Sequence, residues 1–256
     1  MEYIKPKKHL GQHFLKDENI AEKIVKSLSG DLLNILEIGP GTGVLTKYLL
    51  QKKDTQLTVV EIDTESVKFL KKNYPEHTDK IIEGDFLKID PSTIYEEPYA
   101  VIGNFPYNIS SQLLFRILEN RNRIPEVVCM LQKEVAERIS SPPGSKKYGI
   151  ISVLLQAYYN INLLFSVSEN VFVPPPNVKS AVISLKRNSV PELDCDETLF
   201  VRTVKTAFNQ RRKTMRNSLS SLVNDKASLS DPIFNMRPEQ LSVNEFVYVT
   251  RIINSH

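Results

Sequence analysis

The sequence predicts an α/β protein with a parallel sheet, followed by a small helical domain. From residue 32 to about 187, short apolar runs rich in β-branched residues alternate with helical stretches. This alternation is typical of a parallel sheet with helices on both faces. After residue 188 the alternation stops, and residues 197–223 and 242–254 show only helical spacing of their apolar side chains.

The change of pattern near residue 188 suggests a domain boundary. Asn188–Asp196 has the composition of a linker. We therefore expect an α/β domain over residues 1–188, in which 1–30 form an N-terminal arm and a helix, and a helical domain over 189–256.

Each expected strand is a short apolar run that ends in a polar or glycine-containing turn. In chain order the strands are Leu33–Ile38, Leu57–Ile62, Lys80–Glu83, Tyr99–Gly103, Val127–Leu131 and Ala181–Lys186. The helices between them are expected over 42–52, from Thr64 to about Asn73, from Ser110 or Ser111 onward, and over Gln132–Ser140. Two proline-rich interruptions, Ser141–Ser145 and Phe172–Asn177, are expected to be a loop and a rigid extended turn.

Composition narrows the class of protein. Apolar residues make up 41% of the chain and charged residues 25%, as in ordinary globular proteins, and no apolar run reaches the length of a membrane span. The polar N-terminus lacks a signal-peptide core, and Cys129 and Cys195 have no metal-ligand spacing. We expect a cytoplasmic protein with no membrane partner and no metal, and nothing in the sequence suggests an obligate dimer.

Basic residues gather at two places although the net charge is only +3. One cluster, with Lys7 and Lys8, lies in the N-terminal arm. The other lies in the helical domain and comprises Arg211, Arg212, Lys213 and Arg216. Both clusters could contact nucleic-acid phosphates, or they could simply be solvated surface.

A glycine loop follows the first expected strand. Gly39, Gly41 and Gly43 allow a tight turn and a close backbone approach to a ligand, and the helix that follows suits an anion at its N-terminus. In a dinucleotide enzyme that anion is a pyrophosphate, and in an S-adenosylmethionine enzyme it is the methionine carboxylate. The spacing here is G-x-G-x-G, which differs from the G-x-G-x-x-G of dinucleotide folds. A tight strand-to-helix turn without a ligand is the alternative.

Two carboxylates follow the next strands. Glu61 ends the second strand about 20 residues after the loop, where an acid accepts hydrogen bonds from ribose hydroxyls. Asp85 follows the third strand and could accept a hydrogen bond from the adenine amine of the cofactor. A surface carboxylate and a plain Gly-Asp turn are the respective alternatives.

The run Asn104-Phe105-Pro106-Tyr107 suggests a pocket for a flat base. The Asn104 side-chain oxygen and the Phe105 carbonyl can each accept one N–H of an adenine amine, which aims the lone pair of the nitrogen at a methyl donor. Pro106 stiffens the turn, and Tyr107 can stack on the base. A strand-ending turn without such a role is the alternative. Together with the glycine loop, the run suggests methyl transfer to an adenine.

Three further residues are weaker candidates. Phe172, next to the triple proline, could cover the other face of the base or simply fill the core. His13 and Leu15 could line the cofactor pocket as part of an N-terminal lid, although the pattern alone does not show this and a lone histidine is usually structural or solvated.

These segments, taken in order, resemble the KsgA/RsmA family of ribosomal RNA adenine dimethyltransferases over nearly the whole chain. Two residues depart from the commoner pattern: His13 stands where many members have Asn, and Phe105 replaces Leu or Ile. The matching segments are Gly11–Leu15, Leu36–Gly43, Val60–Asp63, Gly84-Asp85, Gly103–Ser110, Phe172–Val182 and Gln210–Leu219.

The resemblance implies a Rossmann-like methyltransferase domain that uses S-adenosylmethionine. It implies transfer of four methyl groups to two adjacent adenosines in the 3′-terminal hairpin of 16S rRNA, in the 30S subunit or its precursor. Target-base contacts are implied at Asn104, Tyr107 and Phe172. Cofactor contacts are implied at His13, Leu15, Gly39, Glu61, Asp85 and Asn104.

Three other functions compete with this one. An Erm-type enzyme acting on large-subunit rRNA would share the fold and Asn104, but Gln210–Leu219 and the triple proline favour the small-subunit enzyme. A non-catalytic RNA-binding or assembly factor is opposed by the intact cofactor residues. An NAD-dependent dehydrogenase is opposed by the spacing of the glycine loop.

Overall fold

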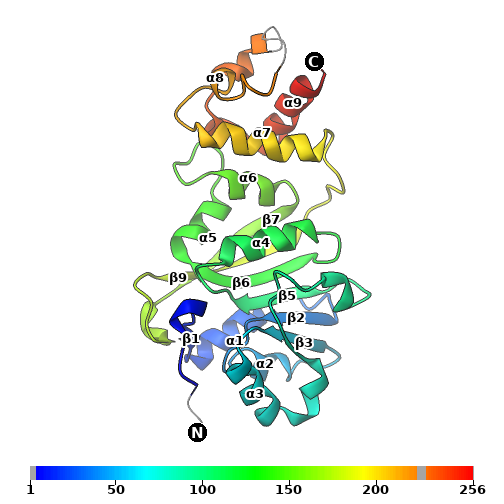
Figure 1. Ribbon diagram of the computed structural model, residues 1–256, viewed down its shortest axis with the longest axis vertical. Coiled ribbons are helices and arrows are strands. Elements are labelled where there is room, and N and C mark those ends of the chain that lie inside the picture. Colours follow the sequence, from blue (N-terminus) through cyan, green and yellow to red (C-terminus); the bar gives the residue numbers. More distant parts are fainter. Residues whose placement is uncertain (1–3, 224–228, 256) are drawn as a thin grey trace. The chain divides into compact units, whose positions relative to one another are not determined.

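The computed structural model describes residues 4–223 and 229–255 (Figure 1). The strands are β1 (Phe14–Leu15), β2 (Asn34–Ile38), β3 (Gln56–Glu61), β4 (Ile81–Glu83), β5 (Ala100–Asn104), β6 (Glu126–Gln132), β7 (Tyr159–Val167), β8 (Phe172–Val173) and β9 (Ser180–Arg187). The α-helices are α1 (Glu18–Lys26), α2 (Thr46–Leu49), α3 (Thr64–Asn73), α4 (Ser110–Glu119), α5 (Lys133–Ser140), α6 (Ile150–Gln156), α7 (Glu197–Asn209), α8 (Met215–Ser218) and α9 (Val243–Asn254).

Seven strands form the larger sheet, in the order β4-β3-β2-β5-β6-β9-β7. The pairs from β4 to β6 are parallel, whereas β9 runs antiparallel to β6. The sheet is therefore mixed, and the expected parallel arrangement holds for β2 to β6 but not for β9. The α/β class itself is confirmed, and Figure 1 shows β2, β3, β5 and β6 side by side.

The strand order creates a binding crevice at a definite place. From β2 the chain moves outward through β3 and β4, and then returns to β5 on the other side of β2. The connections that leave β2 and β5 therefore run in opposite directions from the carboxyl ends of these two neighbouring strands. Ligands of open α/β sheets bind at such a switch point. These are the strand ends that carry the glycine loop and Asn104.

The hydrophobic core around the sheet is built on near-continuous apolar strands. Side chains such as Val101, Ile102 and Val128 are fully buried because both faces of the central strands are covered. The helices α1 and α3 each begin at an aspartate that caps them. The Asp17 side chain accepts a hydrogen bond from the backbone of Ile20 at the start of α1, and Asp63 accepts one from Glu65 at the start of α3.

One expected helix differs from the structure, and some elements were not predicted. The helix expected over 42–52 is α-helical only at Thr46–Leu49, because Gly41 and Gly43 have positive φ angles and hold the preceding residues in turns. The elements α6 and β7 were not predicted. The strand β7 lies at the edge of the sheet with mostly exposed or half-exposed residues, so it lacks a continuous apolar run.

The chain divides into two compact units. One contains the residues up to Ala136 together with Ile161–Arg187, and the other contains Glu137–Asn160 together with the residues from Asn188 onward. The segment 137–160 thus groups with the C-terminal residues, whereas the domain boundary near residue 188 remains a prediction from composition. No helix within residues 4–223 and 229–255 is long and apolar enough to cross a membrane.

Aromatic packing holds the second unit together. The rings of Phe208 on α7 and Phe246 on α9 stack with centroids 5.9 Å apart, and Tyr148 meets Phe208 edge-on at 6.2 Å. The helix α9 begins with a capping box, in which Ser242 and Glu245 bond to each other's backbone. The helical character expected for the C-terminal region agrees with these elements.

Candidate active site

A cavity lies at the carboxyl ends of β2, β3 and β5. Its empty space, including the part open to solvent, is about 930 Å³. Ten of the predicted site residues line it: His13, Leu15, Gly39, Gly41, Glu61, Asp85, Asn104, Phe105, Pro106 and Tyr107. The structure thus brings the glycine loop, the two carboxylates and the Asn-Phe-Pro-Tyr run to one place.

The three glycines of the loop meet different constraints. All have positive φ angles, at 67° for Gly39, 56° for Gly41 and 80° for Gly43. A Cβ on Gly41 would lie 2.8 Å from the Phe14 ring, so this glycine lets the N-terminal segment pack on the loop. A Cβ on Gly43 would instead meet Leu70 at 3.0 Å. Gly43 does not line the cavity, and it allows close packing of the loop against α3.

Glu61 is held rigidly at the end of β3. Its two carboxylate oxygens accept hydrogen bonds from the backbone N–H groups of Gly41 and Asp63, both at 2.9 Å. Burial raises the pKa of the Glu61 carboxyl, and these backbone hydrogen bonds act in the opposite direction. Backbone N–H groups of the protein therefore fix the side chain in one orientation at the cavity wall.

A second buried carboxyl, Glu37, lies in the segment Leu36–Gly43 that the sequence analysis singled out, but the sequence reasoning gave it no role. It lines the cavity, is 1% exposed and accepts a hydrogen bond of 2.6 Å from the Thr46 hydroxyl through one oxygen. The other oxygen has no hydrogen-bond partner among the described residues. Burial, with a smaller contribution from Glu61, raises the pKa of Glu37 to about 8. An acid inside an apolar strand just before a glycine loop was the available signal.

The Asn-Phe-Pro-Tyr run leaves β5 at the cavity. Asn104 donates a hydrogen bond of 3.0 Å from its amide nitrogen to the carbonyl oxygen of His13. No hydrogen bond reaches the amide oxygen of Asn104 from any residue that the structure describes. The hydroxyl groups of Tyr107 and Ser180 are 2.5 Å apart, and this contact fixes the tyrosine ring. Ser180 was also missed, because nothing in its local sequence links it to Tyr107.

His13 covers one side of this region. Its ring stacks on Tyr107 with centroids 5.5 Å apart and an interplanar angle of 27°. Its Nδ1 atom lies 2.8 Å from the carbonyl oxygen of Pro174. The N-terminal segment therefore contacts both the Asn-Phe-Pro-Tyr run and the triple-proline turn.

Phe172 does not reach the cavity. It pairs with Leu15 across the small antiparallel sheet of β1 and β8, and it is 1% exposed in the hydrophobic core. In this structure its ring has core contacts, because the β1–β8 pairing turns it inward. The contact with a target base that the resemblance implies for Phe172 remains a prediction.

The predicted RNA-binding cations fall into two groups. Lys7 and Arg211 are engaged within the protein: Lys7 pairs with Asp63 and Glu65, and Arg211 donates to the backbone carbonyls of the 145–146 turn. The other four side chains are exposed, namely Lys8, Arg212, Lys213 and Arg216. Within residues 4–223 and 229–255 no cluster of His, Cys, Asp and Glu could hold a metal ion.

Comparison with known proteins agrees with this geometry. The family model described as "Ribosomal RNA adenine dimethylase" matches residues 4–254. The chain belongs to the ribosomal RNA adenine dimethylase family. The resemblance drawn from the motifs is thereby confirmed, and the chain is an S-adenosylmethionine-dependent rRNA adenine dimethyltransferase.

Curated relatives match this chain over its full length. "Ribosomal RNA small subunit methyltransferase A" of Flavobacterium johnsoniae is 58% identical and covers 100% of this chain and 98% of its own length. The protein of the same name from Cytophaga hutchinsonii is 54% identical and covers 99% of each chain.

Solved structures agree on the fold. A dimethyladenosine transferase from Plasmodium falciparum superposes with a TM-score of 0.81 at 24% identity, covering 95% of this chain and 98% of that one. The 23S rRNA methyltransferase ErmE superposes with a TM-score of 0.69 at 26% identity, covering 93% and 99%. The Rossmann-like methyltransferase fold is thereby confirmed.

Proposed function

We propose that this enzyme transfers methyl groups from S-adenosylmethionine to the N6 amines of two adjacent adenosines in the 3′-terminal hairpin of 16S rRNA. The products are N6,N6-dimethyladenosines, and the reaction is part of small-subunit biogenesis. Full-length relatives at 54% and 58% identity carry a small-subunit name, whereas the 23S enzyme ErmE is only 26% identical. This difference favours the small-subunit substrate over the Erm-type alternative.

The cavity suits S-adenosylmethionine, which supplies an activated methyl group when bound. Gly39 and Gly41 allow a close backbone approach for its carboxylate, and Glu61 can accept hydrogen bonds from its ribose. The unpartnered oxygen of Glu37 offers an acceptor for a ligand amine. Asp85 at the end of β4 is assigned to the adenine amine, and His13 and Leu15 close the remaining side.

The observation that carries the proposal is the position of Asn104. Its side chain lines the same cavity as Gly39 and Glu61, and its amide oxygen accepts no hydrogen bond from the described residues. That oxygen and the Phe105 carbonyl are assigned to the two N–H groups of the target amine, which orients the nitrogen lone pair toward the methyl group. Pro106 stiffens this turn, and Tyr107 offers its ring to the base.

Positioning supplies most of the rate acceleration in such a reaction. The methyl donor is already reactive, so orientation of the amine lowers the barrier more than a strong base would. The methylated amine loses its extra proton readily, and no metal ion is required. The target adenosine leaves its stack to enter the cavity, as in other enzymes that act on a base.

The exposed cations are assigned to the RNA. Lys8 in the arm and Arg212, Lys213 and Arg216 in the helical region are free to meet phosphates. The partner is 16S rRNA in the 30S subunit or its precursor. We further propose that the enzyme acts in the cytoplasm as a monomer.

Replacement of Asn104 by alanine tests the assignment. The Asn104→Ala variant loses one oriented acceptor and is expected to lose about 2–4 kcal/mol of transition-state stabilisation. Mass spectrometry of rRNA nucleosides after incubation with 30S particles or with protein-free 23S RNA measures both activity and substrate choice. Asn73→Ala, an exposed asparagine of α3 outside the cavity, is the matched control. Near-normal methylation by Asn104→Ala, or a preference for 23S RNA, would contradict the proposal.

A further inference from the structure

The N-terminal arm, residues 4–15, forms one wall of the cavity. Six consecutive residues of the arm, 10–15, line it. Three contacts fasten this stretch at its far end: Phe14 packs on Gly41, the His13 carbonyl accepts a hydrogen bond from Asn104, and β1 pairs with β8. The arm thus covers the cavity, and a separate set of contacts holds its N-terminal end, near Lys7.

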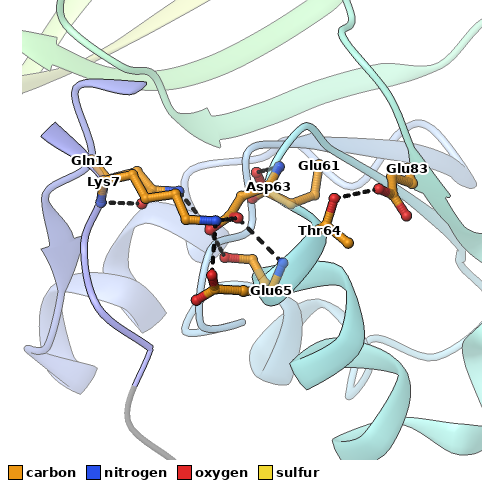
Figure 2. A network of polar contacts seen from close by, with 8 residues as sticks. Lys7, Gln12, Glu61, Asp63, Thr64, Glu65 and Glu83 are labelled. Carbon is orange, nitrogen blue, oxygen red and sulfur yellow. Dashed lines mark hydrogen bonds and ion pairs between the residues drawn. The ribbon is translucent and has the colours of Figure 1, made fainter. Parts of the chain in front are cut away.

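At the near end, two side chains of the arm meet one aspartate (Figure 2). The Lys7 ammonium lies 2.5 Å from Oδ1 of Asp63, and the Gln12 amide donates to Oδ2 at 3.1 Å. Gln12 in turn accepts a hydrogen bond of 2.8 Å from the backbone of Lys7. Glu65 adds a second carboxylate, 3.2 Å from the Lys7 ammonium. We call Lys7, Gln12 and Asp63 the arm clasp.

Burial and charge make the arm clasp more than a loose surface pair. The Asp63 side chain is fully buried, while that of Lys7 is 28% exposed. Burial acts to raise the pKa of Asp63, but hydrogen bonds from Lys7, Gln12 and Ser66 outweigh it, and the pKa lies below the usual range. A buried carboxylate with charged and neutral donors keeps its geometry far better than an exposed pair.

The arm clasp is also connected with Glu61, the side chain proposed to bind the ribose of the cofactor. The backbone N–H of Asp63 donates to Oε1 of Glu61 at 2.9 Å. The same aspartate therefore receives the arm on its side chain and orients Glu61 through its backbone (Figure 2). Release of Lys7 would loosen both the wall formed by the arm and the position of Glu61.

We propose that Lys7 and Gln12 are positioning residues that, through Asp63, hold the arm closed over bound S-adenosylmethionine and set its rate of dissociation. The inference rests on the proposed cofactor site, and it adds two residues that act without touching the ligand. It also gives Lys7 a role different from the phosphate contact expected from charge alone.

The test is made with the full-length chain. Lys7→Met keeps the length of the side chain but removes its charge, and Lys7→Arg restores the charge. Lys16→Met is the matched control, because Lys16 follows the arm directly and is exposed, and its side chain has no partner in the described part of the chain. Stopped-flow release of S-adenosylmethionine, calorimetric affinity, RNA affinity and melting temperature are measured for each variant.

Lys7→Met is expected to release S-adenosylmethionine about tenfold faster, as for loss of a hydrogen bond between charged groups. RNA affinity should stay near that of the unchanged chain, the melting temperature should fall because the buried Asp63 carboxylate loses its charged donor, and Lys7→Arg and Lys16→Met should behave normally. Asp63→Asn keeps a side-chain oxygen to cap α3, and its effect should not add to that of Lys7→Met. Chymotrypsin should also cleave the arm of Lys7→Met faster.

Two outcomes would contradict the role proposed for the arm clasp. One is unchanged release of S-adenosylmethionine by Lys7→Met. The other is a loss of RNA affinity alone, which would make Lys7 a phosphate contact. If the unchanged chain failed to bind S-adenosylmethionine at all, the proposed function itself would fall, and the inference with it.

Discussion

Gly103 stands directly before Asn104 and lies against the end of β2. A Cβ at this position would sit 2.4 Å from the carbonyl oxygen of Ile38, a backbone atom, and 3.1 Å from the Phe105 ring. Gly103 is also paired with Cys129 on β6, so β5 is held from both sides. The substitution Gly103→Ala therefore forces the backbone next to Asn104 to move.

The size of the effect follows from that distance. The Cβ and the Ile38 oxygen must separate by about 1 Å to reach ordinary contact, and overpacking of this kind costs about 1–3 kcal/mol. A cost near 2 kcal/mol lowers the melting temperature of a chain of this size by about 4–8 °C. A displacement of about 1 Å at Asn104 is enough to reduce turnover about hundredfold. Activity should fall far more than the loss of folded protein explains.

The assay compares two glycine variants at a temperature where both are folded. Gly149→Ala is the matched control, because its Cβ would have 3.9 Å to the nearest atom. Thermal melts give stability, and incorporation of labelled methyl groups into 30S particles gives turnover. If Gly103→Ala melted and methylated like Gly149→Ala, the close approach of β5 to β2 and the dependence of activity on the place of Asn104 would both be refuted.

Two further predictions concern Glu37 and Tyr107. The pKa of Glu37 is raised from 4.5 to about 8, so the unfolded chain loses this proton first, and stability falls by up to about 1.4 kcal/mol per pH unit between these values. Thermal melts from about pH 5.5 to 8.5 should show a shallower decline for Glu37→Gln, and equal slopes would contradict the buried neutral acid. Ser180→Ala frees the Tyr107 ring and should reduce kcat/KM for RNA about threefold to tenfold with unchanged S-adenosylmethionine affinity. Tyr107→Phe should lower kcat/KM for RNA by the same factor as Ser180→Ala. If the two losses added up in the double variant, the shared hydrogen bond would be contradicted.

The strands around the site could be predicted because their signals are local. The predicted strands are mostly apolar runs closed by glycine or polar turns, and they appear as β2, β3 and β5 within one residue at each end. The predicted ranges are Leu33–Ile38, Leu57–Ile62 and Tyr99–Gly103. Since parallel strands place their carboxyl ends together, the convergence of Glu61 and Asn104 followed from the sequence alone.

The remainder depends on contacts between distant residues. Lys7 and Asp63 are 56 positions apart, and Tyr107 and Ser180 are 73 apart, so no local pattern reports either contact. The direction of β9 is likewise set by its pairing with β6. Phe172 shows the opposite difficulty: its place in a strong motif indicates a contact with the target base, whereas pairing with Leu15 turns its ring into the core.

The stack between His13 and Tyr107 limits how many bases this tyrosine can hold. One face of the Tyr107 ring is already covered by imidazole, so only the opposite face remains for a purine unless His13 swings away. A platform with a single free face accepts one nucleotide at a time. Under the proposed function, the two neighbouring adenosines would then have to enter one after the other.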